Sequence, residues 1–409
     1  MTIPSFDLSK KIDSMVSAFY DEFPYPPDGL VDGPPPGFNW RWSFEDVYSS
    51  CTGLSPANVG ALKPLRILDA GCGSGVSTDY LAHQNPGSEI LAIDISPGTL
   101  DVARKRLKRS GGDAKARVRI KNCSLLKVEH EESFDYINSV GVLHHLPDPK
   151  EGLKALAKLL KPGGIIHLFL YASHGRKEIQ SIQRALSLLG ADHGGEGVRL
   201  GRELFATLPV NNLLRRSHEQ RWQDLELVDA NFADMYLHPM EKSFVLSELF
   251  QLVDFANLKF LGFSDPATWD ISRLLNGNLL ERARSLTRIS QWQLIEYLDP
   301  EINHFEFFLS KGPLPQKNWN DDSSILSSYG KLSKCIWGWP NKNLLDCNLN
   351  RLVLTDDEFE LLKAIEILSS SVPLGALPLG WKSSRIACTA RTLQEKQVLL
   401  ISLLPNPPT

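Results

Sequence analysis

The sequence predicts an α/β fold with a doubly wound, mostly parallel sheet, to which an N-terminal strap, a helical insert and a small C-terminal module are added. From residue 64 onward, short apolar runs alternate with helical patterns, and this alternation calls for a parallel sheet. The chain has 409 residues, of which 42% are hydrophobic and 22% charged. This length favours two to three domains, each long enough to bury its own core.

Residues 1–50 are expected to form an N-terminal helix followed by a strap. Ile12, Val16 and Phe19 recur at three- and four-residue spacing, which predicts an amphipathic helix within residues 1–22. The prolines that follow cannot continue a helix. Five aromatic residues come next, and they predict a strap packed against a core, with direct ligand contact as the alternative. They are Phe38, Trp40, Trp42, Phe44 and Tyr48.

Residues 51–174 are expected to form the core of the sheet. The apolar runs predict five strands joined by right-handed crossovers, with helices between them. The expected strands are 66–70, 89–94, 118–121, 134–140 and 165–171, and the clearest helices are 97–108 and 150–160.

The rest of the chain divides into three parts. Residues 175–300 are mostly helical in pattern and predict an insert that acts as a lid over substrate. Residues 301–312 hold the apolar run 304–309, which predicts a strand returning to the sheet. Residues 313–409 are expected to form an accessory module, with a helix over 356–368 capped by Thr355.

Composition excludes several classes of protein. The 44 basic residues against 48 acidic ones give a net charge of −4, which argues against a protein built to grip nucleic acid. The six cysteines include no C-x-x-C pair, so we expect reduced thiols, a cytoplasmic location, and neither a disulfide framework nor a metal site. Because no stretch reaches about 18 apolar residues, no membrane contact is expected.

A glycine-rich turn and a later carboxylate predict a cofactor site. Asp69 lies near the end of the first strand, and Gly71, Gly73 and Gly75 follow in the order G-x-G-x-G, which differs from the G-x-G-x-x-G of nicotinamide binders. Asp94 ends the second strand, where a carboxylate can accept both hydroxyls of a ribose. An acid before the turn suits a cationic ligand better than a diphosphate. This favours S-adenosylmethionine, which carries an adenosine but no phosphate.

Four segments in this order resemble the motif set of class I S-adenosylmethionine-dependent methyltransferases. They are Leu68-Asp69-Ala70-Gly71-Cys72-Gly73-Ser74-Gly75, Ile93-Asp94, Phe134-Asp135-Tyr136-Ile137 and Leu160-Lys161-Pro162-Gly163-Gly164. The resemblance implies a sheet of the class I methyltransferase type and methyl transfer that leaves S-adenosylhomocysteine.

The same resemblance implies the roles of the cofactor residues. Asp69 and the three turn glycines would line the methionine part, whereas Asp94, with Ile95 beside it, would hold the ribose. Ser124 stands where relatives often place an aspartate for the adenine amino group.

Two clusters are candidates for activating the methyl acceptor. His144 and His145 follow the fourth strand, and we expect His144 to be a general base of near-neutral pKa and His145 to contact substrate, or the pair to shape the loop. Asp234 and His238, four apart before Pro239, could form an oriented base or a turn tied by its own Asp–His bond.

The outer segments resemble a narrower bacterial subfamily in which a Tyr/Pro segment and a helical insert close over the cofactor. Tyr20, Tyr25 and Tyr171 are the substrate contacts this likeness implies. The layout resembles the enzymes that N-methylate asparagine in phycobiliprotein β-subunits, although the chain lacks an Asn-Pro-Pro-Tyr-type motif after the fourth strand.

We therefore expect a methyltransferase that acts on a protein side chain. The alternatives are a small-molecule O-, N- or C-methyltransferase and a non-catalytic cofactor-binding scaffold. The basic stretch 104–121 is expected to be a solvated face, with the steering of an acidic partner as its alternative.

Overall fold

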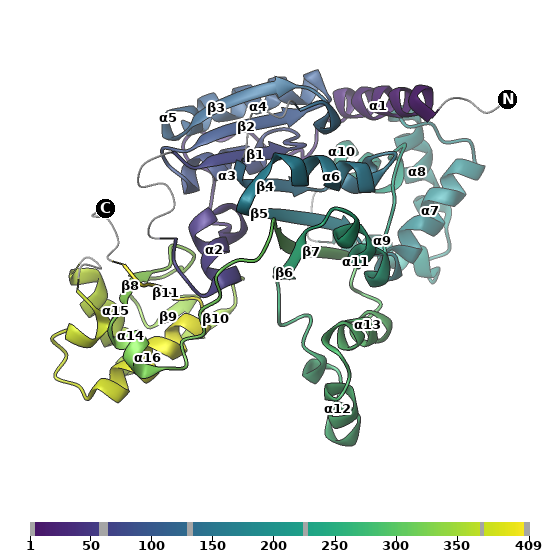
Figure 1. The fold of residues 1–409 in the computed structure, drawn as a ribbon. Coiled ribbons are helices and arrows are strands. Elements are labelled where there is room, and N and C mark those ends of the chain that lie inside the picture. The colour runs from purple at the N-terminus through teal and green to yellow at the C-terminus, as the bar shows by residue number, and fades with distance from the viewer. Residues whose placement is uncertain (1–4, 57–63, 129–133, 224–227, 369–371, 405–409) are drawn as a thin grey trace. The chain divides into compact units, whose positions relative to one another are not determined.

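The structure, a computed structural model, describes residues 5–56, 64–128, 134–223, 228–368 and 372–404 (Figure 1). The chain separates into two compact units. The first takes residues from Met1–Pro34, Arg66–Asp79 and Glu89–Gly312, and the second from Pro35–Leu65, Tyr80–Ser88 and Pro313–Thr409. This division differs from the expected one, because the aromatic strap falls in the same unit as the C-terminal module.

A seven-stranded sheet forms the first unit, in the order β3-β2-β1-β4-β5-β7-β6 (Figure 1). The strands are β1 (Arg66–Ala70), β2 (Glu89–Asp94), β3 (Arg117–Asn122), β4 (Phe134–Val140), β5 (Leu160–Tyr171), β6 (Lys259–Phe263) and β7 (His304–Ser310). Strand β7 is antiparallel to both its neighbours, and the other pairs are parallel. The predicted α/β class with a mostly parallel sheet is confirmed.

Helices connect these strands and extend the unit. The helices that precede β5 and flank these strands are α1 (Ser5–Glu22), α3 (Val76–Gln84), α4 (Pro97–Ser110), α5 (Gly112–Lys115) and α6 (Pro149–Leu159). Those after β5 are α7 (Lys177–Leu188), α8 (Gly195–Thr207), α9 (Leu213–Trp222), α10 (Asp229–Tyr236), α11 (Leu246–Phe255), α12 (Gly277–Arg284) and α13 (Arg288–Leu298).

The predicted insert 175–300 is not wholly helical, because β6 lies within it and joins the sheet. Phe260 and Phe263 belong to an aromatic cluster in which Phe263 stacks on Trp269 at 4.0 Å between ring centroids. A strand of five residues within long helical patterns gives little periodicity to read. The predicted turn at Asp234 is also wrong in part, since Asp234 lies in α10 and only His238 follows the helix.

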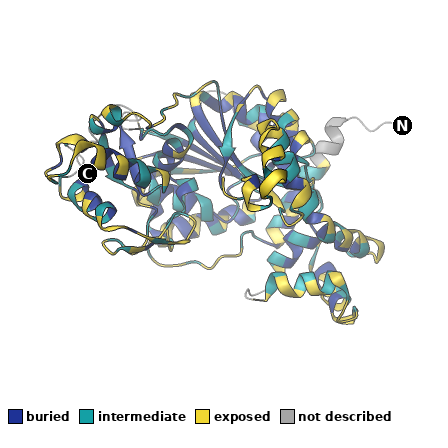
Figure 2. Cartoon of the chain, turned by 90° about the horizontal axis from the view of Figure 1, so that it is seen from below, coloured by how far each residue is buried: buried dark blue, intermediate teal, exposed yellow. Residues whose placement is uncertain are grey.

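The core of the first unit is the interior of the sheet. Strands β1 and β2 are buried from their second residues, which fits parallel strands covered on both faces. Leu68, Ile137 and Phe307 are fully buried, on three strands that span the sheet. In Figure 2 the strands are dark blue and the outer faces of the helices are yellow.

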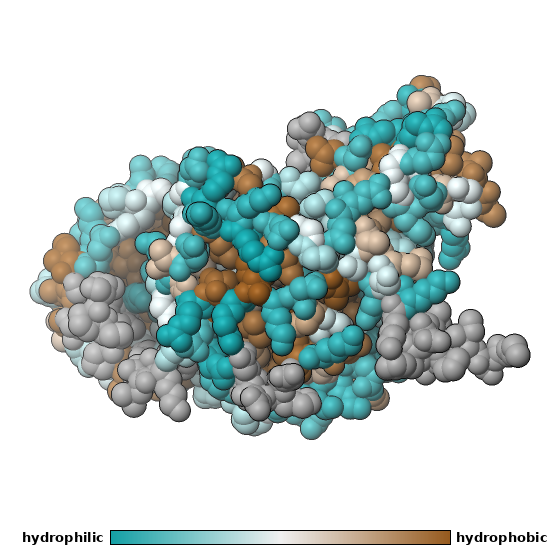
Figure 3. All heavy atoms as spheres, turned by 90° about the horizontal axis from the view of Figure 1, so that it is seen from above, coloured by the Kyte–Doolittle hydropathy of each residue, from teal (hydrophilic) through white to brown (hydrophobic). Residues whose placement is uncertain are grey.

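Several arginines of the basic stretch 104–121 are paired within the chain. Arg104 pairs with Asp101, and Arg109 pairs with Asp32. Arg117 and Arg119 line a hollow of about 220 Å³ at the start of the strands, over Leu91. Figure 3 views the molecule from the β3 side and shows hydrophobic atoms surrounded by hydrophilic ones.

The second unit packs short helices around two small sheets. Its elements are η1 (Trp40–Trp42), α2 (Phe44–Thr52), α14 (Asp322–Leu326), α15 (Asp356–Ile367), α16 (Ser383–Glu395) and the strand pairs β8 (Tyr329–Leu332) with β11 (Leu399–Ser402) and β9 (Asn343–Leu345) with β10 (Arg351–Val353). Thr355 caps α15 through a capping box with Glu358, as predicted.

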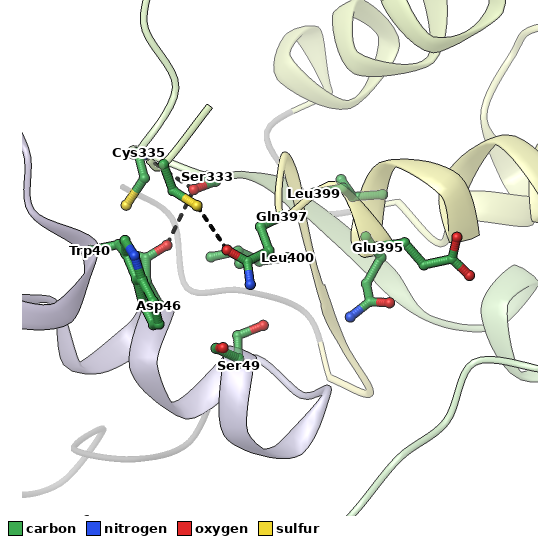
Figure 4. A pocket seen from close by; sticks show the side chains of 12 residues that line it. Trp40, Asp46, Ser49, Ser333, Cys335, Glu395, Gln397, Leu399 and Leu400 are labelled. Atoms are coloured by element: carbon green, nitrogen blue, oxygen red, sulfur yellow. Dashed lines mark hydrogen bonds between the residues drawn. The ribbon is translucent and has the colours of Figure 1, made fainter. Parts of the chain in front are cut away.

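A small polar pocket of about 110 Å³ lies in the second unit (Figure 4). Ser333 Oγ donates to Asp46 Oδ1 at 3.2 Å, and Cys347 Sγ donates to Gln397 Oε1 at 2.8 Å. Burial raises the pKa of Asp46. The pocket is thus lined by groups that already bond to one another.

No helix among the described residues is long and apolar enough to cross a membrane. Within the same residues, no group of three or more His, Cys, Asp or Glu side chains could hold a metal ion. All six cysteines are free.

Candidate active site

The glycine turn bends sharply between β1 and α3. Gly71, Gly73 and Gly75 have φ of +80°, +51° and +83°, which disfavour any side chain. The turn is fixed to the next strand, because the amides of Gly71 and Cys72 both donate to the Ile93 carbonyl at 2.8 and 2.9 Å.

Asp69 is fully buried and anchors this turn through its side chain. Its Oδ2 accepts hydrogen bonds from Ser77 and Thr78 at 2.7 and 2.6 Å, and its Oδ1 accepts one from Asn138 Nδ2 at 2.8 Å. Burial raises the pKa of Asp69, opposed by these bonds. Asp69 therefore holds the first turn of α3 to β4.

That anchor continues across the sheet as a chain of hydrogen bonds. Asn138 Oδ1 lies 2.9 Å from His167 Nδ1, and His167 Nε2 lies 3.0 Å from Glu306 Oε1. Ser264 Oγ donates to the other oxygen of Glu306. These residues stand on β1, β4, β5 and β7 and just after β6, so five adjacent strands each contribute one member.

Asp94 lies beside the turn, at the end of β2. Its Oδ2 accepts from the Gly73 amide at 3.0 Å and its Oδ1 from the Ser96 amide at 2.9 Å. Burial raises its pKa, opposed by these backbone bonds. Two backbone amides, one on each oxygen, thus fix the orientation of the carboxylate.

Ile95 and Ser124 complete this side of the site. The Ile95 carbonyl accepts from Ser17 Oγ of α1 at 3.0 Å and from Asn122 Nδ2 at 2.9 Å. Ser124 directly precedes the turn η2 (Leu125–Lys127) and is 8% exposed. The strand ends therefore bring both residues to the Asp94 edge.

Residues 25–29, which precede the aromatic segment, form a separate strap that lies against the glycine turn. The Tyr25 carbonyl accepts from the Ser74 amide at 2.9 Å, and a side chain at Gly73 would meet that carbonyl oxygen at 2.4 Å. Arg106 ties the strap down, since its guanidinium donates to the carbonyls of Ser74, Asp28 and Gly29.

The two histidines after β4 stack into an aromatic cluster. His144 stacks on Tyr171 with 3.9 Å between ring centroids, and His145 stacks on His238 with 3.7 Å. His145 Nδ1 lies 2.8 Å from the Met240 carbonyl oxygen. Tyr20 reaches the same cluster, 5.4 Å from His238.

The expected near-neutral pKa of the histidines is wrong. Burial lowers the pKa of His145 to about 4 and lowers that of His144 well below its ordinary value, with neighbouring positive groups adding to the effect. Burial also lowers the pKa of His238. All three rings are therefore neutral at pH 7, and each offers one donor and one acceptor.

Some of the hydrogen-bonding nitrogens on these rings have no partner among the described residues. Within the described part of the chain, neither ring nitrogen of His144 has a hydrogen-bond partner, and neither does Nε2 of His238. The Nδ1 of His238 accepts from the Met240 amide at 3.1 Å. Buried polar atoms without partners are costly, so this cluster is poised to bond a polar ligand.

Asp234 faces the cluster from α10. Tyr20 Oη donates to its Oδ1 at 3.0 Å. Burial raises the pKa of Asp234 to about 7, helped by Glu241 and opposed by the Tyr20 bond and by Arg176. The structure thus joins Asp234 to Tyr20, where the sequence suggested a bond to His238.

A buried ion pair beside this cluster was not predicted from the sequence. Arg176 donates to both carboxylate oxygens of Glu241 at 3.1 and 2.8 Å, and the two side chains are 5% and 7% exposed. The guanidinium carbon lies 3.5 Å from the centroid of the Tyr171 ring. The partners are 65 residues apart, and no local pattern marks either of them.

The strand order, the glycine turn and the paired acids at the carboxyl edge define a class I S-adenosylmethionine-dependent methyltransferase. Among the described residues, neither Asp69 nor Asp94 pairs with a lysine or arginine, which fits a cofactor that carries an adenosine and positive charge but no phosphate. Asp94, Ile95 and Ser124 would hold it there, and it supplies the methyl group.

Comparison with known proteins agrees. A family model described as "Methyltransferase domain" matches residues 68–166. The chain is 44% identical over 396 residues to the uncharacterized protein syc1184_c of Synechococcus sp., covering 95% of this chain and 94% of that one. The chain therefore belongs to the same family as syc1184_c.

Shorter and more distant similarities accompany this one. The "uncharacterized phycocyanin operon protein W" of Pseudanabaena tenuis is 50% identical over 100 residues, 24% of this chain and 91% of that protein. A ubiquinone biosynthesis O-methyltransferase of Xanthomonas axonopodis is 37% identical over 136 residues, 32% of this chain and 55% of that one. PKMT2 from Rickettsia typhi, solved with AdoHcy, has the same fold at a TM-score of 0.62 and 18% identity, covering 90% of this chain and 77% of that one.

Proposed function

We propose that this enzyme methylates a nitrogen in a protein side chain, and that an asparagine of a phycobiliprotein-like acceptor is the candidate target. The observation that carries the proposal is the set of open hydrogen-bonding atoms on His144 and His238, in the aromatic cluster whose Tyr20 donates to the Asp234 carboxylate. A carboxamide offers two N–H donors and one carbonyl acceptor, which matches the kinds of group present, a carboxylate and neutral imidazoles. We also propose that the enzyme acts in the cytoplasm.

The chemistry explains why a carboxylate of raised pKa is useful here. An amide nitrogen is a poor nucleophile, because its lone pair is delocalised into the carbonyl. As a methyl group is transferred to it, the nitrogen must lose a proton to a base within hydrogen-bond reach. In this proposal Asp234 takes that proton, and a pKa of about 7 makes it a stronger base than an ordinary aspartate.

The neighbouring groups would orient the acceptor. His144 and His238, which burial keeps neutral, would bond the amide rather than take its proton. Tyr20 would hold Asp234 in place, and Tyr25, His145 and Tyr171 would line the path of the side chain. The similarity to the phycocyanin operon protein supports the choice of acceptor.

The test uses labelled S-adenosylmethionine with purified phycocyanin from cells that lack this enzyme. We expect label in the protein, and fragmentation of the peptides should place one added methyl group on an asparagine. Asp234→Asn should bind the cofactor but lose turnover.

Two results would contradict the proposal. Label found only in the low-mass fraction of a lysate would favour the small-molecule alternative, for which the match to ubiquinone O-methyltransferases is the support. Bound cofactor with no label in any fraction would favour the non-catalytic scaffold.

A further inference from the structure

We propose that the arm between β6 and β7, residues 264–303, docks an acidic acceptor protein through its tip, residues 276–289. This inference rests on the proposed protein acceptor and names the surface that would recognise it. The arm holds the turn η5 (Ile271–Arg273) and helices α12 and α13. Figure 1 shows these helices below β6 and β7, and Figure 2 views the chain from that side.

The root of the arm lies at the edge of the sheet that carries the candidate active site. Strand β6 runs parallel to β5, because both are antiparallel to β7, so the chain enters the arm at the end where β5 reaches Tyr171. It leaves beside the same residue, since Tyr171 pairs with His304. The Ala172 amide donates to the Asn303 carbonyl at 2.9 Å, and His174 packs against Tyr297 of α13.

The root of the arm is buried, whereas much of the tip is exposed. Ile271 and Ile295 are at most 3% exposed and pack into the core of the unit, and Ala283 anchors the tip in the same core. At the tip, Leu279 is 62% exposed, and Leu286 and Ile289 are 44% and 45% exposed. Large aliphatic side chains gathered on one projecting segment are typical of a protein-binding surface.

The charge of the tip selects the kind of partner. Arg282, Arg284 and Arg288 are all exposed, and among the described residues no carboxylate lies within ion-pair distance of them, although Asp270 nearer the root attracts Arg284 and Arg288 from farther away. By contrast, Arg273 nearer the root pairs with Asp299. Glu281 is the one acid in residues 276–289. The surface therefore complements carboxylates set around aliphatic side chains.

A nucleic acid is the less favoured occupant. Single strands are held by basic grooves with stacking aromatic rings, and residues 276–289 contain no aromatic residue. An acidic protein surface uses both the guanidinium groups and the aliphatic side chains.

The test measures kcat and KM of the full-length enzyme with purified phycocyanin as the probe. Arg282→Glu with Arg284→Glu should raise KM roughly tenfold or more and leave kcat and the Kd for S-adenosylmethionine unchanged. Leu279→Ser with Ile289→Ser should also raise KM. Increasing salt should raise the wild-type KM more than that of the arginine variant.

A charge reversal on another exposed helix is the matched control. Arg216→Glu on α9 should leave KM unchanged. A short peptide that contains the target asparagine should be methylated equally by the wild type and the arm variants, because it is too small to reach the tip.

The two proposals can fail separately. Methylation of phycocyanin with the same KM in wild type and arm variants would overturn the docking surface alone, and so would an equal effect of Arg216→Glu. If the arm variants lost RNA binding but kept their KM for the protein, the arm would be a nucleic-acid surface. Absence of any label in protein with the wild type would overturn the proposed function, and the docking surface with it.

Discussion

Among single residues, Asp94 is the one whose loss should most directly remove cofactor binding. Its carboxylate is held by the Gly73 and Ser96 amides at the edge of the sheet, outside the apolar core, so Asp94→Ala should still fold. Hydrogen bonds to a charged group contribute about 1.5–3 kcal/mol. We expect S-adenosylmethionine to bind roughly 30-fold or more weakly, measured by calorimetry, with an unchanged circular dichroism spectrum.

Asp101→Ala is the control for that measurement, because Asp101 is exposed and, among the described residues, pairs with Arg104 on the same helix. An affinity of Asp94→Ala equal to that of the wild type would remove Asp94 from the cofactor site.

Asp234 should make stability depend on pH. Its pKa is raised to about 7 in the folded chain against 3.8 ordinarily, so the fold favours the protonated form. Stability from this group is complete below pH 4 and is lost as the pH rises through 7. At 1.36 kcal/mol for each pKa unit, the loss reaches up to about 4 kcal/mol.

Asp234→Asn keeps an oxygen for Tyr20 but cannot ionise. It should therefore be more stable than the wild type at pH 8 and equal to it at pH 4, measured by urea unfolding. Turnover of the wild type should rise with pH with a midpoint near 7. An identical stability difference at both pH values would show that Asp234 does not titrate in this range.

Among the elements, the strap at residues 25–29 is held by Ser74 of the glycine turn and by Arg106 of α4. Arg106→Gln removes donors to the carbonyls of Asp28, Gly29 and Ser74. The strap should then leave the glycine turn more often, raising the Kd for S-adenosylmethionine several-fold and the rate of limited proteolysis near residue 30. Arg104→Gln, two residues earlier on α4 and exposed, should change neither; equal effects of the two substitutions would contradict this role.

The sequence predicted well those elements whose signals are local. The strands before Asp69 and Asp94 are continuous apolar runs, and the turn between them needs three glycines with positive φ, so a few adjacent residues determine each. Strand β6 was missed, because its five residues stand among long helical segments and gain their partner only through β7.

The structure brings several of the candidate residues together, but through connections that the sequence did not predict. Residues from α1, β4, β5 and α10 do meet, yet Asp234 bonds Tyr20, 214 residues away, rather than its near neighbour His238. The neutral state of His144 and His145 follows from burial, which depends on tertiary packing and has no local pattern. The same reason hides the Arg176–Glu241 pair.

In the molecule as a whole, we expect the segment 35–56, near the start of the chain, to depend on residues 313–404 for its packing. Within the second unit, the Lys317 amide donates to Thr52, Trp319 donates to Gly53, and Lys331 pairs with Glu45 of α2. A chain that ends at residue 312 should expose Trp40 and Val47, which are now at most 3% exposed. We expect it to be poorly soluble and to bind a hydrophobic dye.

A chain ending at residue 403, which keeps β11, is the control for this truncation. If the chain that ends at 312 were monomeric, showed no dye binding and unfolded cooperatively, the segment 35–56 would not depend on the C-terminal residues.

The hydrogen-bonded chain from Asp69 to Ser264 has a consequence for how this sequence can change over evolutionary time. Because Asn138 uses its Nδ2 as the donor to Asp69, its oxygen must accept from His167, which leaves the other ring nitrogen to bond Glu306. Each member thus dictates whether the next one gives or receives. A replacement at one of these five positions would reverse a donor and an acceptor in the interior, so in related sequences the five should vary as a group or stay fixed together.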